Sequence, residues 1–157
     1  MSGPSLDPTA WFGEELGAAQ RARLQQLGRP TSYVAGAEIV REGVVVTDMG
    51  IVTRGRLALR LFVPGRGQLT ILTVEPGDVF DWSAVVPPYR ASSTIVAVEP
   101  TEAIAYDAAA LRAALAEDPQ LAAIVYPRLL AAVSRRLQAT RLQLLDLFAA
   151  EGSTGWK

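Results

Sequence analysis

The spacing of apolar residues changes twice along the chain and divides it into three regions. Over residues 9–28 apolar positions recur three or four residues apart, which is the spacing of one helix face. Over residues 32–106 short runs of Val, Ile, Leu and Thr are interrupted by Gly or Pro every few residues. Over residues 107–148 the helical spacing returns. This order predicts a mainly β fold, an antiparallel β-roll or jelly-roll barrel with an N-terminal helix and a long C-terminal helix.

Residue types that favour helix N-termini mark the starts of the predicted helices, and a proline marks a predicted irregularity. Asp7 and Thr9 are both candidate N-caps of the first helix, and Asp107 and Asp118 are candidate N-caps of two C-terminal helices. Pro127 lies inside the second C-terminal helix, where its missing N–H and its ring should kink or interrupt the helix.

The length of 157 residues suits one domain with a hydrophobic core. We expect that single domain over residues 11–148, with flexible ends at residues 1–10 and 149–157. Within it, the segment RLALRLFVPGRGQLTILTV, residues 56–74, has two alternating arms around a Pro and Gly turn and predicts a β-hairpin.

The charged and reactive residues exclude several classes of function. Lys and Arg number 15 against 16 Asp and Glu, so the net charge is −1. A DNA-binding protein needs a basic surface to displace counterions, so we expect no direct DNA binding. The chain has no Cys and no His, which removes the commonest metal ligands and the commonest general base. We therefore expect no metal, no cofactor and no enzymatic activity.

The hydrophobic pattern also predicts where in the cell the protein is found. The start of the chain, MSGPSLDPTAWFGEELG, carries acidic residues and has no apolar core, so it does not read as a signal peptide. No segment reaches the length of a membrane span without a charge. These features predict a cytoplasmic protein that does not enter the membrane.

An apolar seam in the last helix predicts a homodimer. Its members recur at spacings of three, four and seven residues, and Thr140 fills the vacant seam position. The simplest partner is the same helix of a second copy. The alternative is a helix packed on its own barrel, for which Leu142, Leu145 and Phe148 form a second apolar stripe. The predicted dimer interface consists of Leu130, Val133, Leu137, Leu144 and Leu147.

Four motifs, in this order, resemble the cyclic nucleotide-binding domain of the catabolite activator protein (Crp/Fnr) superfamily. They are AGAEIVREG, GIVTRGRLAL, VEPGDVF and SRRLQAT, and the likeness covers about residues 11–148. The resemblance implies a β-roll that binds a cyclic nucleotide such as cAMP or cGMP. Only AAEGSTGWK follows Phe148, which is too short for a helix-turn-helix domain, so a stand-alone sensor domain is expected.

The resemblance places a phosphate-binding cassette in GDVFDWSAVVPPYRASS, residues 77–93. In the family a short helix and an Arg hold the cyclic phosphate, and a carboxylate takes the ribose hydroxyl. Here Asp81 stands where the family has Gly, and Trp82 where it has Glu. Counted forward from Trp82, Arg90 lies earlier than the Arg of the family's cassette. Counted back from Ala97, Ala91 occupies the Arg position and Arg90 lies one place before it. The implied ligand-binding residues are Asp81, Trp82, Ser83, Ala84, Arg90, Ala91 and Ser92.

Three interpretations of this cassette stay open. In the first, Arg90 pairs with a phosphate while the short helix adds its amides and Ser83 or Ser92 adds a hydroxyl. In the second, Trp82 fills the place of the ribose, and the domain binds a different ligand or none. In the third, Trp82 belongs to the ordinary core, as most buried Trp residues do.

The long helix completes the site that the resemblance implies. Thr140 would lie near the purine at the dimer seam, and Arg141 replaces the small hydroxyl residue expected next. We interpret Arg135, Arg136 and Arg141 as a solvated face of the helix rather than a phosphate site. The expected function is a regulatory sensor for a cyclic nucleotide or related anion, which signals through this helix to an unknown partner protein. The alternative is a degenerate domain that binds no ligand and serves to dimerise or dock.

Overall fold

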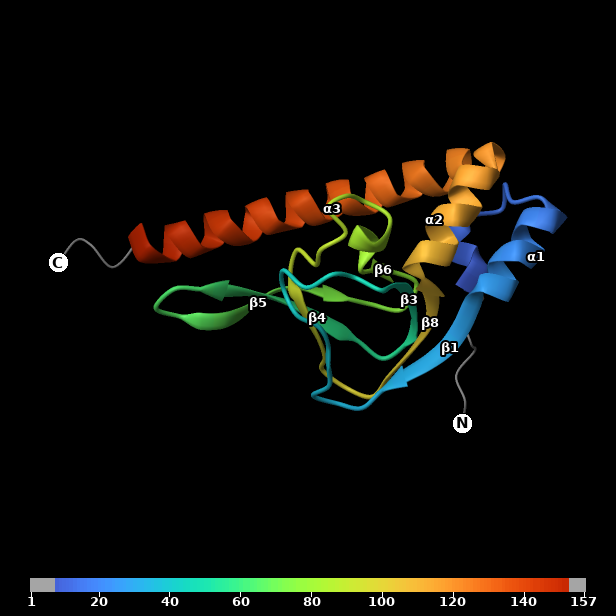
Figure 1. The fold of residues 1–157 in the computed structure, drawn as a ribbon. Helices are drawn as coiled ribbons and strands as arrows, with labels where there is room; N and C mark the ends of the chain where they lie inside the picture. The colour runs from blue at the N-terminus through green and yellow to red at the C-terminus, as the bar shows by residue number, and fades with distance from the viewer. Residues whose placement is uncertain (1–7, 153–157) are drawn as a thin grey trace.

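The computed structural model describes residues 8–152 and confirms the predicted fold class (Figure 1). Within these residues, eight strands form two four-stranded sheets with only antiparallel pairings. The strand orders are β1-β8-β3-β6 and β2-β7-β4-β5. The strands are β1 (Gly28–Tyr33), β2 (Glu38–Val40), β3 (Asp48–Arg54), β4 (Leu57–Val63), β5 (Gly67–Val74), β6 (Val79–Phe80), β7 (Thr94–Ala97) and β8 (Thr101–Asp107).

The first helix is shorter than predicted. Instead of one helix over residues 9–28, the chain forms a 3₁₀ helix, η1 (Pro8–Phe12), and then α1 (Ala18–Leu27). Gly13 separates them with a φ of 92°, a conformation that favours glycine. A β-carbon on Gly13 would lie 1.8 Å from a guanidinium nitrogen of Arg128, so a larger residue here would also have to displace the end of that side chain.

The cap of α1 also differs from the prediction. The backbone N–H of Gly17 donates to Oε1 of Gln20 at 3.0 Å, so a side chain inside the first turn satisfies the backbone before the helix. Thr9 lies in η1, and Asp7 lies outside the described residues. The roll then begins at Gly28 in β1 rather than at residue 32.

The caps predicted for the C-terminal helices, α2 (Ala108–Glu117) and α3 (Pro119–Gly152), are confirmed. Asp107 Oδ2 accepts a backbone N–H of the first turn of α2 at 2.9 Å. Asp118 Oδ1 accepts two backbone N–H groups of α3, at 3.0 and 3.1 Å. Each contact satisfies donors that a helix start leaves without an intrahelical partner.

Pro127 does not interrupt the helix, because α3 continues through it and ends at Gly152 rather than at residue 148, while a kink at this position stays a prediction. A proline inside a helix removes one hydrogen bond and costs about 3 kcal/mol. Leu121 and Val125 before it and Leu129 after it are all buried. Burying side chains of this size stabilises by about 1.5–3 kcal/mol each, which outweighs the proline penalty and holds both halves in one helix.

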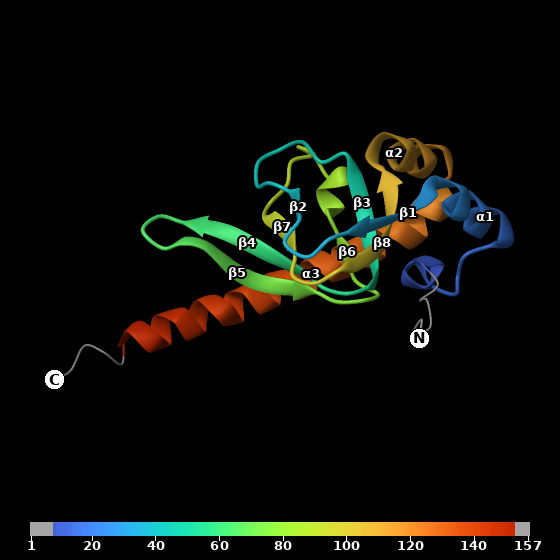
Figure 2. The ribbon, with the colours of Figure 1, turned by 90° about the horizontal axis from the view of Figure 1, so that it is seen from below.

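The core has two parts. One lies where the helices meet the roll and includes Phe12, Met49, Tyr106 and Leu111. The other lies between the two sheets, and its members are Val52, Leu57, Leu59, Val74, Phe80, Ile95, Ala97 and Ala103. The helices thus cover one end of the roll, while the other end leads to the β4–β5 hairpin (Figure 2).

The β4–β5 hairpin is confirmed, and α3 runs past it. The two strands pair from Leu57 with Val74 to Val63 with Gly67, with one irregularity after Leu59. α3 contacts β5 and then extends beyond the body of the roll (Figures 1 and 2). Every residue of α3 over positions 141–150 is exposed. None of the helices in the described part of the chain is long and apolar enough to cross a membrane.

Candidate functional site

A cavity of about 220 Å³ lies between the β4–β5 pair, the segment after β6 and the inward face of α3. We call it the α3 cavity. The two strands contribute a wholly apolar wall, and the other elements add both apolar and polar side chains. Its lining residues are Leu59, Leu61, Ile71, Leu72, Trp82, Ser92, Ser93, Val133, Arg136, Leu137 and Thr140.

The cassette begins with a left-handed residue. Asp81 has φ 56° and ψ 40°, and a single 3₁₀ turn, η2 (Trp82–Ala84), follows it. Asp is one of the few non-glycine residues that tolerate this conformation, which agrees with its position where the family has Gly. The turn closes with the N–H of Ala84 donating to the carbonyl of Asp81 at 3.0 Å. The cassette therefore starts with a left-handed residue that is followed by one turn of 3₁₀ helix.

Two arginines fasten the cassette region to the helices. Arg112 of α2 donates from Nη1 to the carbonyl of Ala84 at 2.6 Å, and its guanidinium lies 4.4 Å from the ring centre of Tyr89. Arg136 of α3 donates from Nη2 to the carbonyl of Val79 in β6. Both hydrogen bonds join the cassette region to a helix, so a displacement of the cassette would strain or break its contacts with α2 and α3.

Arg90 lies on the outside of this site. Its side chain is exposed and donates from Nη1 to the carbonyl of Gly43 at 2.9 Å. Its backbone forms an isolated antiparallel bridge with Val45, and the next residue, Ala91, is buried and bonded to Gly43 and Val44. Arg90 is not among the residues that line the α3 cavity. The pairing with the 43–45 segment turns it away, so the geometry gives its predicted phosphate contact no support.

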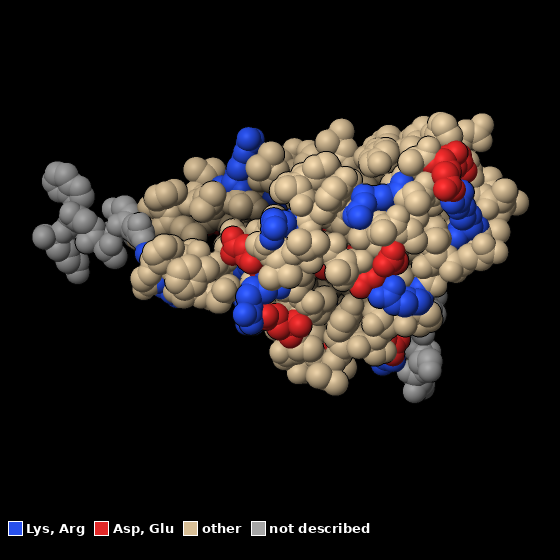
Figure 3. All heavy atoms as spheres, in the orientation of Figure 1, with Lys and Arg blue, Asp and Glu red and all other residues tan. Residues whose placement is uncertain are grey.

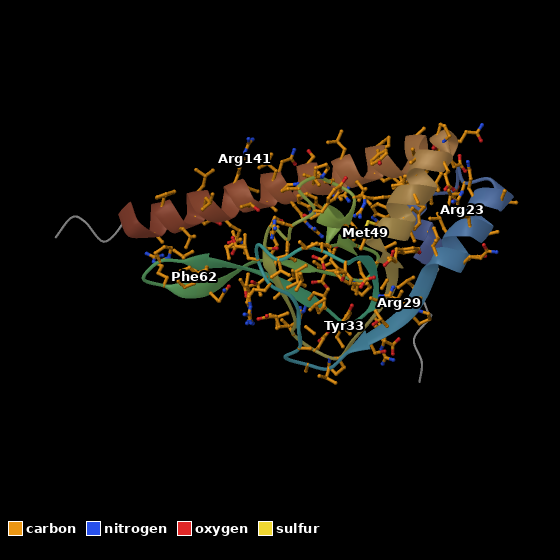
Figure 4. All side chains as sticks on the ribbon, viewed as in Figure 1. Arg23, Arg29, Tyr33, Met49, Phe62 and Arg141 are labelled. Carbon is orange, nitrogen blue, oxygen red and sulfur yellow. The ribbon has the colours of Figure 1, made fainter. Side chains whose placement is uncertain are left out.

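The other cassette residues divide between two sides of the roll. Trp82 and Ser92 line the α3 cavity, and Trp82 is half-buried and also packs against the first core cluster. Ser83 and Ala84 are buried. Asp81 lines a different groove together with Tyr33, the last residue of β1, which is labelled in Figure 4. The side chains implied as one binding set are therefore not gathered at one cavity.

Arg136 corrects the interpretation of a solvated arginine face. It is half-buried in the wall of the α3 cavity, and burial lowers the pKa of its guanidinium, while Asp78 and Asp81 raise it. Arg135 and Arg141 are exposed, and Arg141 extends from the side of α3 away from the hairpin (Figure 4). The sequence does carry a signal for this position. Arg136 lies three residues after the seam residue Val133 and four before the seam residue Thr140, so all three lie on one side of the helix.

Asp81 carries the largest electrostatic perturbation of the cassette. Burial raises its pKa from 3.8 to about 7; Arg136 opposes this change and the carboxylate of Asp48 adds to it. Elsewhere on the face in Figure 3, basic and acidic side chains are interspersed. The described residues contain no group of three or more acidic side chains placed to hold a metal ion.

The predicted seam of α3 faces two environments. Val133, Leu137 and Thr140 line the cavity of their own roll, although Leu137 keeps 52% of its surface exposed. Leu130, Leu144 and Leu147 are exposed. The alternative stripe of Leu142, Leu145 and Phe148 is 64–69% exposed, so it does not pack on the roll as that alternative required.

Comparisons with known proteins agree with this architecture. The chain is similar to a cyclic nucleotide-binding domain of Methylobacillus flagellatus KT, at 20% identity, covering 85% of this chain and 75% of that one, with TM-score 0.76. It is similar to the Thermus thermophilus catabolite activator protein, at 24% identity, 88% and 63% coverage and TM-score 0.68. It is also similar to the Toxoplasma gondii PKA regulatory domain solved with cAMP, at 20% identity, 82% and 44% coverage and TM-score 0.60. Curated protein sequences give no match.

These structural likenesses, all below 25% identity, concern the fold. The sequence profile of the cyclic nucleotide-binding domain matches residues 30–118, which is more than half of the chain and includes the cassette. The resemblance expected from the four motifs is thus confirmed, and the chain belongs to the cyclic nucleotide-binding domain family.

Proposed function

We propose that this chain is a ligand-sensing regulatory domain, in which a small anionic molecule binds in the α3 cavity and α3 reports its presence. One observation carries the proposal. The cavity wall is shared between the roll, the cassette and α3, and the single charged residue that the structure describes in that wall, Arg136, comes from α3 itself. A ligand in this place would touch the binding segment and the helix at once.

The coupling follows from differential binding. A ligand that contacts both the cassette and α3 binds one arrangement of the two better than another, and it shifts the population by that difference. The bond from Arg136 to Val79 already joins α3 to β6, so an anion near Arg136 would compete with it or reinforce it. The helix would then change its packing without any covalent chemistry, and the proposed role is regulatory rather than enzymatic.

The exposed end of α3 supports the proposed readout. Leu144 and Leu147 present apolar surface to solvent, at 47% and 38% exposure. A second copy of this helix would cover them, as a heptad seam favours. We propose a homodimer through α3, with a partner protein that reads the arrangement of the two helices.

Cyclic nucleotides are the first ligands to test, because the family and the cAMP-bound structural relative direct attention to them. The alternative function is a docking module that binds no nucleotide. The hydrogen bond of Arg90 to Gly43 favours it, because it removes the expected phosphate partner from the cavity.

A filled cavity separates the two functions. Leu61→Trp would place an indole in the α3 cavity, whereas Phe62→Trp changes the neighbouring position, which is 60% exposed and lies on the other strand face (Figure 4). We expect a ligand that raises the melting temperature of the wild type to lose that effect in Leu61→Trp and to keep it in Phe62→Trp. The screen should include cAMP, cGMP and a library of small organic anions. No ligand at all, together with an intact dimer, would favour the docking module, whereas a ligand effect that persists in Leu61→Trp would put the binding site outside the α3 cavity.

A further inference from the structure

The α3 cavity has few of the polar partners that a cyclic nucleotide requires: its polar lining residues are Ser92, Ser93, Arg136 and Thr140. Among the described residues that line it there is no Asp or Glu to take a ribose hydroxyl. Arg90 is engaged at Gly43, and Asp81 lines the other groove. A nucleotide hydroxyl or ring nitrogen placed against the β4–β5 wall would lose its water without a replacement, at a cost of about 1–3 kcal/mol for each group.

The cavity instead offers apolar surface on several sides. Leu59, Leu61, Ile71 and Leu72 come from the strands, and Val133 and Leu137 come from α3. Trp82 adds an aromatic ring, which favours stacked or edge contacts with another aromatic ring. The volume of about 220 Å³ lies below the range of about 300–1,000 Å³ typical of drug-sized ligands. This lining suits a ligand with a small, flat, apolar ring system.

One positive charge stands in this apolar surrounding. Over residues 8–152, Arg136 is the only charged residue in the lining, and it is half-buried. A guanidinium has five N–H donors, and the contact with Val79 engages the Nη2 group. A carboxylate can accept two parallel N–H bonds from such a group, and charged pairs of this kind are about twice as strong as neutral ones. Thr140, one helical turn further on, adds a hydroxyl to the lining.

Resting on the proposed function, we infer that the ligand of the α3 cavity is a small aromatic monocarboxylate rather than a cyclic nucleotide. The ring contacts Trp82 and the apolar strand wall, and the carboxylate accepts hydrogen bonds from Arg136. This assignment makes Arg136, and not Arg90, the residue that recognises the anion.

The test compares three probes by isothermal titration calorimetry on the full chain: 2-naphthoate, its neutral isostere 2-naphthamide, and cAMP. We expect 2-naphthoate to bind at least 10-fold more tightly than 2-naphthamide. Arg136→Gln should weaken 2-naphthoate about 10- to 100-fold and leave 2-naphthamide nearly unchanged. The matched control is Arg135→Gln, an exposed neighbour on the same helix, which should change neither affinity. Leu61→Trp should abolish binding of both naphthalene probes.

The possible failures are distinguishable. If cAMP binds more tightly than 2-naphthoate and Leu61→Trp removes it, the aromatic-acid inference is overturned while the proposed sensing function stands. Equal affinities for the acid and the amide would refute the role of the charge, and this comparison needs no variant that must fold. If no small molecule of any class binds the wild type, the inference and the proposed function fall together.

Discussion

The half-buried carboxyl of Asp81 should make the stability of this domain fall as the pH rises from about 4 to about 7. Burial raises its pKa in the folded state from 3.8 to about 7. Between these values the folded chain holds a proton that the unfolded chain has lost, so the free energy of unfolding decreases as the pH increases. Above about pH 8 both states are ionised, and the full penalty is present.

The magnitude follows from the two pKa values. Each pH unit between them corresponds to about 1.4 kcal/mol, which sets an upper limit of about 4 kcal/mol. Asp81 is not fully buried and Arg136 lies nearby, so screening reduces the expected penalty to about 1–3 kcal/mol. Asp81→Asn removes the charge and keeps a side chain that tolerates the left-handed backbone. It should therefore be more stable than the wild type at pH 8 and nearly equal to it at pH 4.

Urea unfolding followed by far-UV circular dichroism, at fixed protein concentration from pH 4 to pH 8.5, measures this difference. Asp146→Asn, at an exposed position of α3, is the control and should leave the pH dependence as it is in the wild type. If Asp81→Asn is less stable than the wild type at pH 8, then the ionised carboxylate is stabilised by Arg136 by more than burial costs, which refutes a net penalty for its ionisation.

Three further changes test other contacts. Asp118→Ala should lower the free energy of unfolding by about 1 kcal/mol in urea titrations, because it removes the acceptor for two N–H groups of α3, and no loss would mean that water replaces the cap. Arg112→Leu should speed hydrogen–deuterium exchange in the cassette, since it breaks the bond to the Ala84 carbonyl; unchanged exchange would show that the cassette is held by other contacts. Leu144→Asp should convert the proposed dimer to a monomer in light-scattering measurements, with Leu142→Asp as a control outside the seam, and a dimer that survives Leu144→Asp would exclude this interface.

Much of the fold was predictable because its signals are local. The alternating arms around Pro64–Gly67 form β4 and β5, since the period of the side chains and the turn residues lie within one segment. Asp107 and Asp118 cap the helices that they precede, since a cap reaches only two or three residues along the chain. The order of helix, strands and helices, together with four short motifs, was enough to identify the family.

Contacts between distant segments decided the rest. Gly13, which separates η1 from α1, lies beside the side chain of Arg128 from α3, and α3 continues through Pro127 because its buried face is held on both sides. The same holds for the site. Residue type alone does not distinguish Arg90 from Arg136. In the structure Arg90 donates to the carbonyl of Gly43 on the surface, and Arg136 donates to the carbonyl of Val79 beside the cavity. The residue types set which interactions each side chain can make, but only the packing of the roll against α3 determined that Arg90 is exposed and that Arg136 lines the cavity.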